Sequence, residues 1–148
     1  MKNRTVDKQI TLIPYYPNPQ TSLKWYLDPD VCKQVDNIDH VYTLELLNDM
    51  YTYLSTHGEC YYIQYMGELV GDVSLCNNGE ISIVVCKEYQ NLHIGRRCVL
   101  NMIRRAKEKG MKQLKANIYS FNTQSQKMFE AIGFQKVEEE WYSFKVDE

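Results

Sequence analysis

Apolar residues recur along the chain with two different periods, which predict helices and strands in alternation. In residues 41 to 56 and 94 to 109 they recur three and four positions apart, as on one face of an amphipathic helix, and a glycine follows each stretch. Shorter segments, in which apolar residues alternate or run together, predict strands at residues 10–13, 60–65, 69–76, 80–85, 114–118, 135–140 and 141–146.

Turn and capping residues set the order of these elements. Met66-Gly67-Glu68 and Asn77-Asn78-Gly79 are typical hairpin connections, so the three strands that they join are expected to form an antiparallel meander. Residues 21 to 26 predict a short first helix, followed by a polar connection that carries several aspartates. Asn122 is a suitable N-cap for a further helix, and Gly133 fits the left-handed position after its end.

The resulting order βααβββαβαββ predicts an α+β fold of mixed α/β character. Its sheet is expected to be mostly antiparallel, with one strand-helix-strand crossover. At 148 residues, with 44% apolar and 24% charged residues, the chain has the composition of an ordinary globular protein. We expect residues 1 to 148 to form one domain.

Composition also bears on location and on metal binding. Because no apolar run is long enough for a signal peptide or a membrane span, we expect a cytoplasmic protein without a membrane partner. The five cysteines are an odd number at wide spacings, without a C-x-x-C pair or a histidine at zinc-finger distance. We interpret them as reduced, mostly buried thiols and expect no metal site.

Charge is distributed unevenly although the net charge is only −2. Residues 1 to 75 contain 5 Lys and Arg against 10 Asp and Glu, whereas residues 76 to 148 contain 12 against 9. This asymmetry suggests two different ligands, although chance segregation of surface charge would give the same pattern. Residues 96 to 115 hold 8 Lys and Arg with one Glu, but we expect a solvated helix face there and no nucleic-acid partner, because the protein is acidic overall.

The sequence EISIVV-CKEYQNLH-IGRRCV predicts a strand, a loop and the first turn of a helix. Such a helix N-terminus offers unpaired backbone N–H groups and the positive end of the helix dipole, which together bind phosphate oxygens. Arg96 and Arg97 lie in the first turn, where a cation opposes the dipole by about 0.3 to 1 kcal/mol unless an anion lies between them. Two solvated arginines that tolerate this small penalty are the alternative.

Two motifs in this region resemble those of one family. Gln90-Asn91-Leu92-His93-Ile94-Gly95 is similar to the Q/R-x-x-G-x-G/A signature with which GNAT acetyltransferases bind the pyrophosphate of coenzyme A. The run from Asn122 to Phe134 resembles the second family motif, whose Asn and Ser contact the cofactor and which ends in G-F. With the length of the chain and the order of its elements, they extend the resemblance over roughly residues 9 to 146. It implies the GNAT fold, in which helices flank a central sheet on both faces, with acetyl-CoA as the cofactor.

The resemblance implies that the cofactor contacts the end of one strand, the signature loop and the start of the second motif. The residues concerned are Val84, Val85, Gln90, Asn91, Leu92, His93, Ile94, Gly95, Arg96, Arg97, Asn122, Ser125 and Phe129.

Two of these positions depart from the family pattern. His93 replaces the first Gly of the signature, and a residue with a Cβ adopts positive φ only at a cost. With negative φ in the loop, the His93 N–H would still face a phosphate. Phe129 occupies the place where many members carry a Tyr that resembles a general acid, and Phe cannot donate a proton. A thiolate is a fair leaving group without help, and Tyr142 or Tyr119 are candidates for the missing donor.

The family reaction is direct attack of an amine on the thioester, with the carbonyl oxygen held by a backbone N–H near Val84 and Val85. Because an alkylamine is protonated at neutral pH, a base must take its proton. Glu80 resembles the position of the catalytic Glu in several GNAT enzymes and is our candidate, with Ser82 on the same strand face as a residue that orders water. A Glu that simply faces solvent at a hairpin end is the alternative.

Acceptor selection in this family is generally made by the first two helices. Trp25 and Tyr26 lie there and are candidates to enclose an acceptor, although aromatic residues on a short helix are more often part of the core. The acidic residues of this region suit a cationic amine; they are Asp28, Asp30, Asp36 and Asp39.

The predicted activity is acetyl transfer to a primary amine of a small molecule or a peptide. A protein that binds acyl-CoA without turning it over is the alternative, and a homodimer is one option for the assembly.

Overall fold

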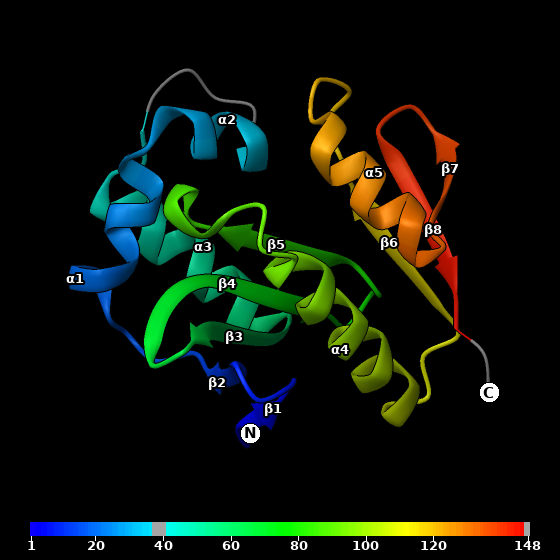
Figure 1. Ribbon diagram of the computed structural model, residues 1–148, viewed down its shortest axis with the longest axis horizontal. Coiled ribbons are helices and arrows are strands. Elements are labelled where there is room, and N and C mark those ends of the chain that lie inside the picture. Colours follow the sequence, from blue (N-terminus) through cyan, green and yellow to red (C-terminus); the bar gives the residue numbers. More distant parts are fainter. Residues whose placement is uncertain (37–40, 147–148) are drawn as a thin grey trace.

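The computed structural model describes residues 1 to 36 and 41 to 146, whose strands form two antiparallel sheets (Figure 1). The first sheet has the order β1-β2-β3-β4-β5. Its strands are β1 (Arg4–Thr5), β2 (Ile10–Pro14), β3 (Gly58–Tyr65), β4 (Glu68–Cys76) and β5 (Ile81–Val85). The second sheet has the order β6-β8-β7. It consists of β6 (Gln113–Asn117), β7 (Gln135–Glu138) and β8 (Trp141–Lys145).

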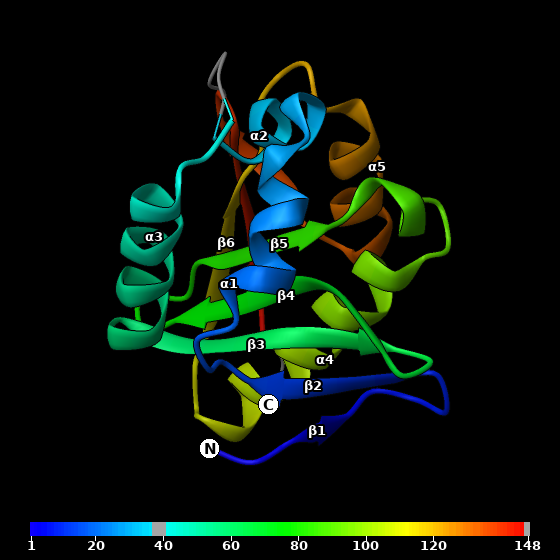
Figure 2. The same ribbon diagram turned by 90° about the vertical axis from the view of Figure 1, so that its left-hand side faces the viewer.

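Helices cover both faces of the first sheet. They are α1 (Pro19–Ser22), the 3-10 helix η1 (Leu23–Leu27), α2 (Pro29–Asp36), α3 (Leu44–Thr56), the 3-10 turn η2 (Lys87–Tyr89), α4 (Ile94–Glu108) and α5 (Thr123–Ile132). Figure 2 shows α3 on one side of the sheet and α4 on the other. No helix in residues 1–36 and 41–146 has the length and apolar character that crossing a bilayer would require.

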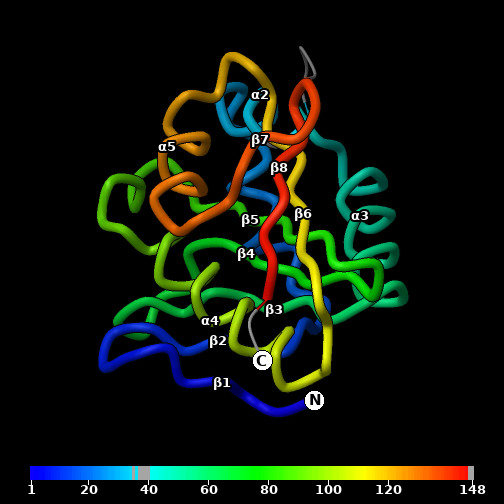
Figure 3. Tube along the Cα trace, turned by 90° about the vertical axis from the view of Figure 1, so that its right-hand side faces the viewer, coloured from blue at the N-terminus to red at the C-terminus, as the bar shows by residue number. Residues whose placement is uncertain are grey.

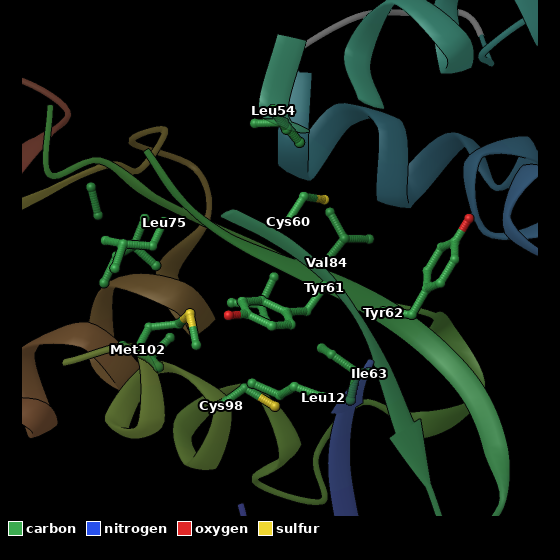
Figure 4. Close-up of a cluster of buried hydrophobic side chains, with 14 of the residues drawn as sticks. Leu12, Leu54, Cys60, Tyr61, Tyr62, Ile63, Leu75, Val84, Cys98 and Met102 are labelled. Atoms are coloured by element: carbon green, nitrogen blue, oxygen red, sulfur yellow. The ribbon is translucent and has the colours of Figure 1, made fainter. Parts of the chain in front are cut away.

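The core occupies both faces of the first sheet because successive residues of a strand point to opposite sides. Tyr61 and Tyr62, neighbours on β3, show this directly: Tyr61 points toward α4 and Tyr62 toward the side of the N-terminal helices (Figure 4). Both are at most 2% exposed. Burial on both faces explains why this strand is a continuous run of large side chains rather than an alternating one.

The two sheets meet at one short contact. Glu80, just before β5, forms an isolated parallel bridge with Lys115 of β6, and the Lys115 N–H donates to the Gly79 carbonyl at 3.0 Å. Beyond this bridge β5 and β6 separate, and the strands of the second sheet run across those of the first (Figure 3). The sequence predicted the strand-helix-strand crossover from β5 through α4 to β6, but not that the ladder between its strands would be so short.

Other differences from the prediction lie in the N-terminal third. The polar connection after the first helix contains α2, which begins after Asp28; the side chain of Asp28 accepts from the Asp30 N–H at 2.9 Å and Pro29 fills the first helical position. The first predicted helix is divided into α1 and η1, and the second begins at Leu44 rather than at residue 41, with Thr43 as its N-cap. Strand β1 was not predicted.

Candidate active site

A cleft of about 840 Å³ opens where β5 and β6 separate. Its wall is formed by β4, β5 and β6, by the N-terminal turns of α4 and α5, and by residues of η1, α2 and α3. The segments that the sequence singled out as the two cofactor motifs and the acceptor region therefore all contribute to one space.

The start of α4 forms one end of this cleft. Gln90, Asn91, His93, Gly95 and Arg96 all line it. His93 is the N-cap residue and its side chain makes no capping hydrogen bond. The N–H groups of the first turn have no partner within the helix, so they remain available to an anion.

The backbone at His93 differs from the favourable case considered above. Its φ is +59° and its ψ is +20°, so the residue adopts the left-handed conformation despite its Cβ, and Asn91 also has positive φ, at +68°. The negative φ considered for His93 in the sequence analysis is therefore not what the structure has. The loop takes the conformation that a glycine would take there at lower cost, and His is among the residue types that tolerate it best.

The two arginines of the signature have different surroundings. The Arg97 guanidinium donates to Asp7 at 2.9 Å, to Gln9 at 2.8 Å and to the Leu92 carbonyl at 3.1 Å, and neither Arg97 nor Leu92 lines the cleft. Arg96 is exposed, lines the cleft and makes no ion pair with the described residues. Of the two cations, only Arg96 is placed to meet an anion in the cleft.

The start of α5 faces the same end of the cleft. The Asn122 side chain caps the helix by accepting from the Ser125 N–H at 3.3 Å, and both residues line the cleft. Gln124 Nε2 donates to Asn91 Oδ1 at 2.8 Å, which ties the two motifs together. Lys127, in the second turn, also lines the cleft; the sequence analysis missed it, although the reasoning applied to Arg96 extends to any cation near a helix N-terminus.

The strand β5 presents a backbone donor, the Val85 N–H, beside these motifs. The Cys86 N–H donates to the Val70 carbonyl at 2.8 Å and the Cys76 N–H to the Glu80 carbonyl at 2.9 Å, so even-numbered residues of β5 bond to β4. The Val84 N–H therefore belongs to that ladder. The Val85 N–H points to the opposite side, where β6 has diverged, and the Val85 carbonyl accepts from Gln90 Nε2 at 3.0 Å.

The other end of the cleft is acidic. Glu80 is half-buried and lines it together with Ser82. Asp36 lines it too and accepts from the Tyr42 hydroxyl at 3.0 Å. Asp28 and Asp30 do not line this cleft, and Asp39 lies outside the described residues.

A further carboxylate, Asp72 of β4, forms part of this wall and was missed in the sequence. It is 2% exposed, and its Oδ2 accepts from the Tyr26 hydroxyl at 2.7 Å and the Tyr51 hydroxyl at 2.8 Å. Burial raises the pKa of Asp72 to about 6, and the two hydrogen bonds act in the opposite direction. The available signal was a single acid inside the otherwise uncharged strand sequence LVGDVSLC.

Of the four aromatic candidates, two line the cleft and two do not. Tyr26 lines the cleft, whereas Trp25 does not and packs edge-on against Tyr62 with ring centroids 6.0 Å apart. Tyr119 lines the cleft, whereas Tyr142 is buried in β8 and does not.

The last two cofactor candidates, Phe129 and Ile94, are both buried and line the cleft. All five cysteines are unpaired and buried, as expected.

Comparison with known proteins agrees with this geometry. The model of the acetyltransferase (GNAT) family matches residues 23–134. Among solved structures, the chain is similar to a GNAT-family acetyltransferase from Bacillus anthracis, with 18% identity, a TM-score of 0.79 and coverage of 95% of this chain and 97% of that one.

Two further similar structures were determined with bound ligands. A spermidine N-acetyltransferase from Vibrio cholerae, in complex with CoA and spermine, has 11% identity and a TM-score of 0.77, with coverage of 95% and 97%. A GNAT-family acetyltransferase from Elizabethkingia anophelis, with acetyl-CoA bound, has 19% identity and a TM-score of 0.67, with coverage of 95% and 100%. These similarities establish the α+β GNAT fold. Because the family model matches three quarters of this chain, the chain belongs to the acetyltransferase (GNAT) family.

Proposed function

We propose that this chain transfers the acetyl group of acetyl-CoA to a primary amine of a small molecule or a peptide. The observation that supports this most is the polarity of the cleft. The N-termini of two helices line one part of it with Arg96 and Lys127, and the carboxylates of Asp36, Asp72 and Glu80 line the rest. A diphosphate and a cationic amine are the ligands that complement these two parts.

The residues at the basic end fit coenzyme A. The first-turn N–H groups of α4 and the Arg96 guanidinium would hold the pyrophosphate, and Asn122 and Ser125 at the start of α5 would contact the pantetheine arm. Gly95 keeps this end open: a Cβ built there would meet only Met128 Cε at 3.7 Å and Ile83 Cδ1 at 3.8 Å, so the space in front of the helix is not filled by protein.

Acetyl-CoA supplies a thioester, which an amine attacks directly. The Val85 N–H would stabilise the oxyanion that develops on the carbonyl, because it is a fixed donor on the side of β5 where the ladder ends. Glu80 is half-buried at the start of the same strand and remains our sequence-based candidate for the base, acting through water. Tyr119 is the candidate to protonate the departing thiolate, because it lines the cleft and Tyr142 does not.

Two measurements test this proposal. Calorimetric titration with acetyl-CoA and with dephospho-acetyl-CoA should show binding in the micromolar range, about −8 kcal/mol. Release of free thiol is then followed with spermidine, benzylamine and a lysine-containing peptide as acceptors. Spermidine is included because one similar structure is a spermidine N-acetyltransferase. Binding without turnover of any amine would favour the alternative, a protein that binds acyl-CoA without catalysis; no binding at millimolar ligand would contradict both.

A further inference from the structure

We propose that Asp72 is the group that takes the proton from the acceptor's ammonium. This inference rests on the proposed acetyl transfer and adds to it the residue that makes the amine nucleophilic. Three features of the structure carry it: the place of Asp72 in the sheet, the hydrogen bonds of its carboxylate, and the kind of side chains that surround it.

Asp72 lies next to the open backbone donor. In the β4–β5 ladder it is the direct partner of Val84, whose neighbour Val85 presents its N–H to the cleft. Adjacent strands are about 4.8 Å apart and the Val85 N–H points away from β4, so the backbone of Asp72 is roughly two strand spacings, about 10 Å, from the expected position of the thioester, a gap that the Asp72 side chain and the acceptor's amine would share. Glu80 lies five residues before Val85, or about 16 Å along the strand at 3.3 Å per residue, and can act there only through its side-chain length and water.

One oxygen of this carboxylate is engaged and the other is free. Both tyrosine hydroxyls donate to Oδ2, and no described residue donates to Oδ1. Among the described residues the only fully buried side-chain polar atom without a partner is Ser74 Oγ, so Oδ1 retains access to the space of the cleft. Tyr26 and Tyr51 thus fix the orientation of the carboxylate and leave one oxygen for an incoming N–H donor.

The described residues around Asp72 include no cation. The titratable side chains that face it come from η1, α3, β3 and the segment before α3, and they are Tyr26, Tyr51, Tyr42, Tyr62 and Cys60. No ion pair in the described part of the chain includes Asp72. A buried carboxylate without a counter-ion reduces stability when it is ionised, and burial here raises its pKa to about 6. An ammonium group that enters the cleft supplies the missing positive charge.

The proton balance of the reaction is then complete. The substrate ammonium gives one proton to Asp72 Oδ1, which becomes a carboxylic acid, and the nitrogen lone pair forms the new C–N bond with the thioester carbonyl carbon. The C–S bond breaks, and its electrons leave with the sulfur as a thiolate. A second proton from the nitrogen converts this thiolate to the thiol, and Asp72 returns its own proton to solvent. A group with a pKa near neutrality is suited to both directions of this transfer.

The test compares two acceptors of nearly the same shape in the full-length protein. Benzylamine is an ammonium ion at neutral pH, whereas O-benzylhydroxylamine is already unprotonated and needs no base for attack. In Asp72→Asn, kcat/KM for benzylamine should fall by roughly 100-fold or more, the usual range for loss of a general base, whereas kcat/KM for O-benzylhydroxylamine should stay within about threefold of wild type. Titration with acetyl-CoA checks that the variant binds the cofactor, and its thermal midpoint checks that it is folded.

A second pair of variants tests whether the carboxylate titrates during the reaction. Tyr51→Phe removes a hydrogen bond that lowers the pKa of Asp72, so the acidic limb of the benzylamine pH–rate profile should move to higher pH. Tyr53→Phe is the matched control, because Tyr53 lies on the same helix, is exposed and stacks on His57; its profile should match wild type.

The outcomes separate this inference from the proposed function. An equal loss for both acceptors in Asp72→Asn, or no loss at all, would assign Asp72 a structural role while leaving acetyl transfer established. A selective loss of benzylamine turnover in Glu80→Gln, but not in Asp72→Asn, would assign proton removal to Glu80 and overturn the proposal. Failure of the wild type to acetylate any amine while it binds acetyl-CoA would refute the proposed function itself, and proton removal by Asp72 with it.

Discussion

On the side of the first sheet away from the acidic end of the cleft, Glu59 lies at the centre of a charged cluster that offers a quantitative test of the structure. Its carboxylate accepts from Arg105 Nε at 3.0 Å and Nη2 at 2.8 Å, from the Tyr61 hydroxyl at 2.6 Å and from Lys109 Nζ at 3.2 Å. The Glu59 side chain is only 10% exposed. The hydrogen bond from Arg105 is the main cause that lowers the pKa of Glu59 to about 2, while burial opposes it.

A lowered carboxyl pKa stabilises the folded state only where the carboxylate is ionised. The folded value of about 2 lies below the ordinary 4.5, so the contribution is complete at neutral pH and is lost as pH falls from the ordinary value through the folded one. After allowance for solvent screening, the difference corresponds to roughly 2 to 3 kcal/mol at pH 7. At about pH 3 some 1 to 2 kcal/mol of this is gone, because the unfolded chain is then protonated and the folded one is not.

The free energy of unfolding of wild type and Glu59→Gln is measured by urea unfolding at pH 7 and at pH 3. The stability difference between wild type and variant should be roughly 2 to 3 kcal/mol at pH 7 and should shrink by about 1 to 2 kcal/mol at pH 3. Glu138→Gln, at an exposed position on β7, is the control and should show no such change. A difference that is the same at both pH values would mean that the charge of Glu59 does not contribute to the stability of the folded state.

The remaining predictions concern the cleft. Gly95→Glu places bulk and negative charge at the phosphate end and should weaken acetyl-CoA binding by about 100-fold or more by calorimetry; Gly95→Ala, whose Cβ would have ordinary contacts, should fold like wild type, and unchanged affinity in folded Gly95→Glu would contradict the site. His93→Gly relieves a left-handed residue and should raise the free energy of unfolding by up to about 1 kcal/mol in urea; a decrease would show that the imidazole itself stabilises the loop. With Asp72 as the base, Glu80→Gln should keep the wild-type pH–rate profile; a kcat/KM that falls most at low pH, where the amine is hardest to deprotonate, would assign proton removal to Glu80 instead.

Much of the fold could be predicted because local patterns determine it. The helical spacing over residues 94 to 109 placed α4 within one residue of its observed end, and the two hairpin turns placed β3, β4 and β5. Helix α2 was missed because it is short, although Asp28 and Pro29 are an ordinary helix start. Strand β1 has two residues, which is too few for a period to be recognised.

The candidate site shows where sequence reasoning ends. The motifs predicted which segments meet in the cleft, but Arg96 and Arg97 differ through contacts such as that of Arg97 with Asp7, about 90 positions earlier in the chain. Asp72 is likewise defined by hydroxyls that lie 46 and 21 positions away. Such partners are brought together by tertiary packing, which leaves no period in the sequence.

The bridge between Glu80 and Lys115 joins the two sheets, which diverge from this point. In the described part of the chain β5 and β6 pair at Glu80 and Lys115, and the cleft opens where the two strands separate. Gly79 permits this close approach: a Cβ built on it would come within 2.6 Å of the Gln113 carbonyl oxygen, so a larger residue would require the backbone to shift there. A residue that does not line the cleft therefore determines how closely the two sheets approach where the cleft begins.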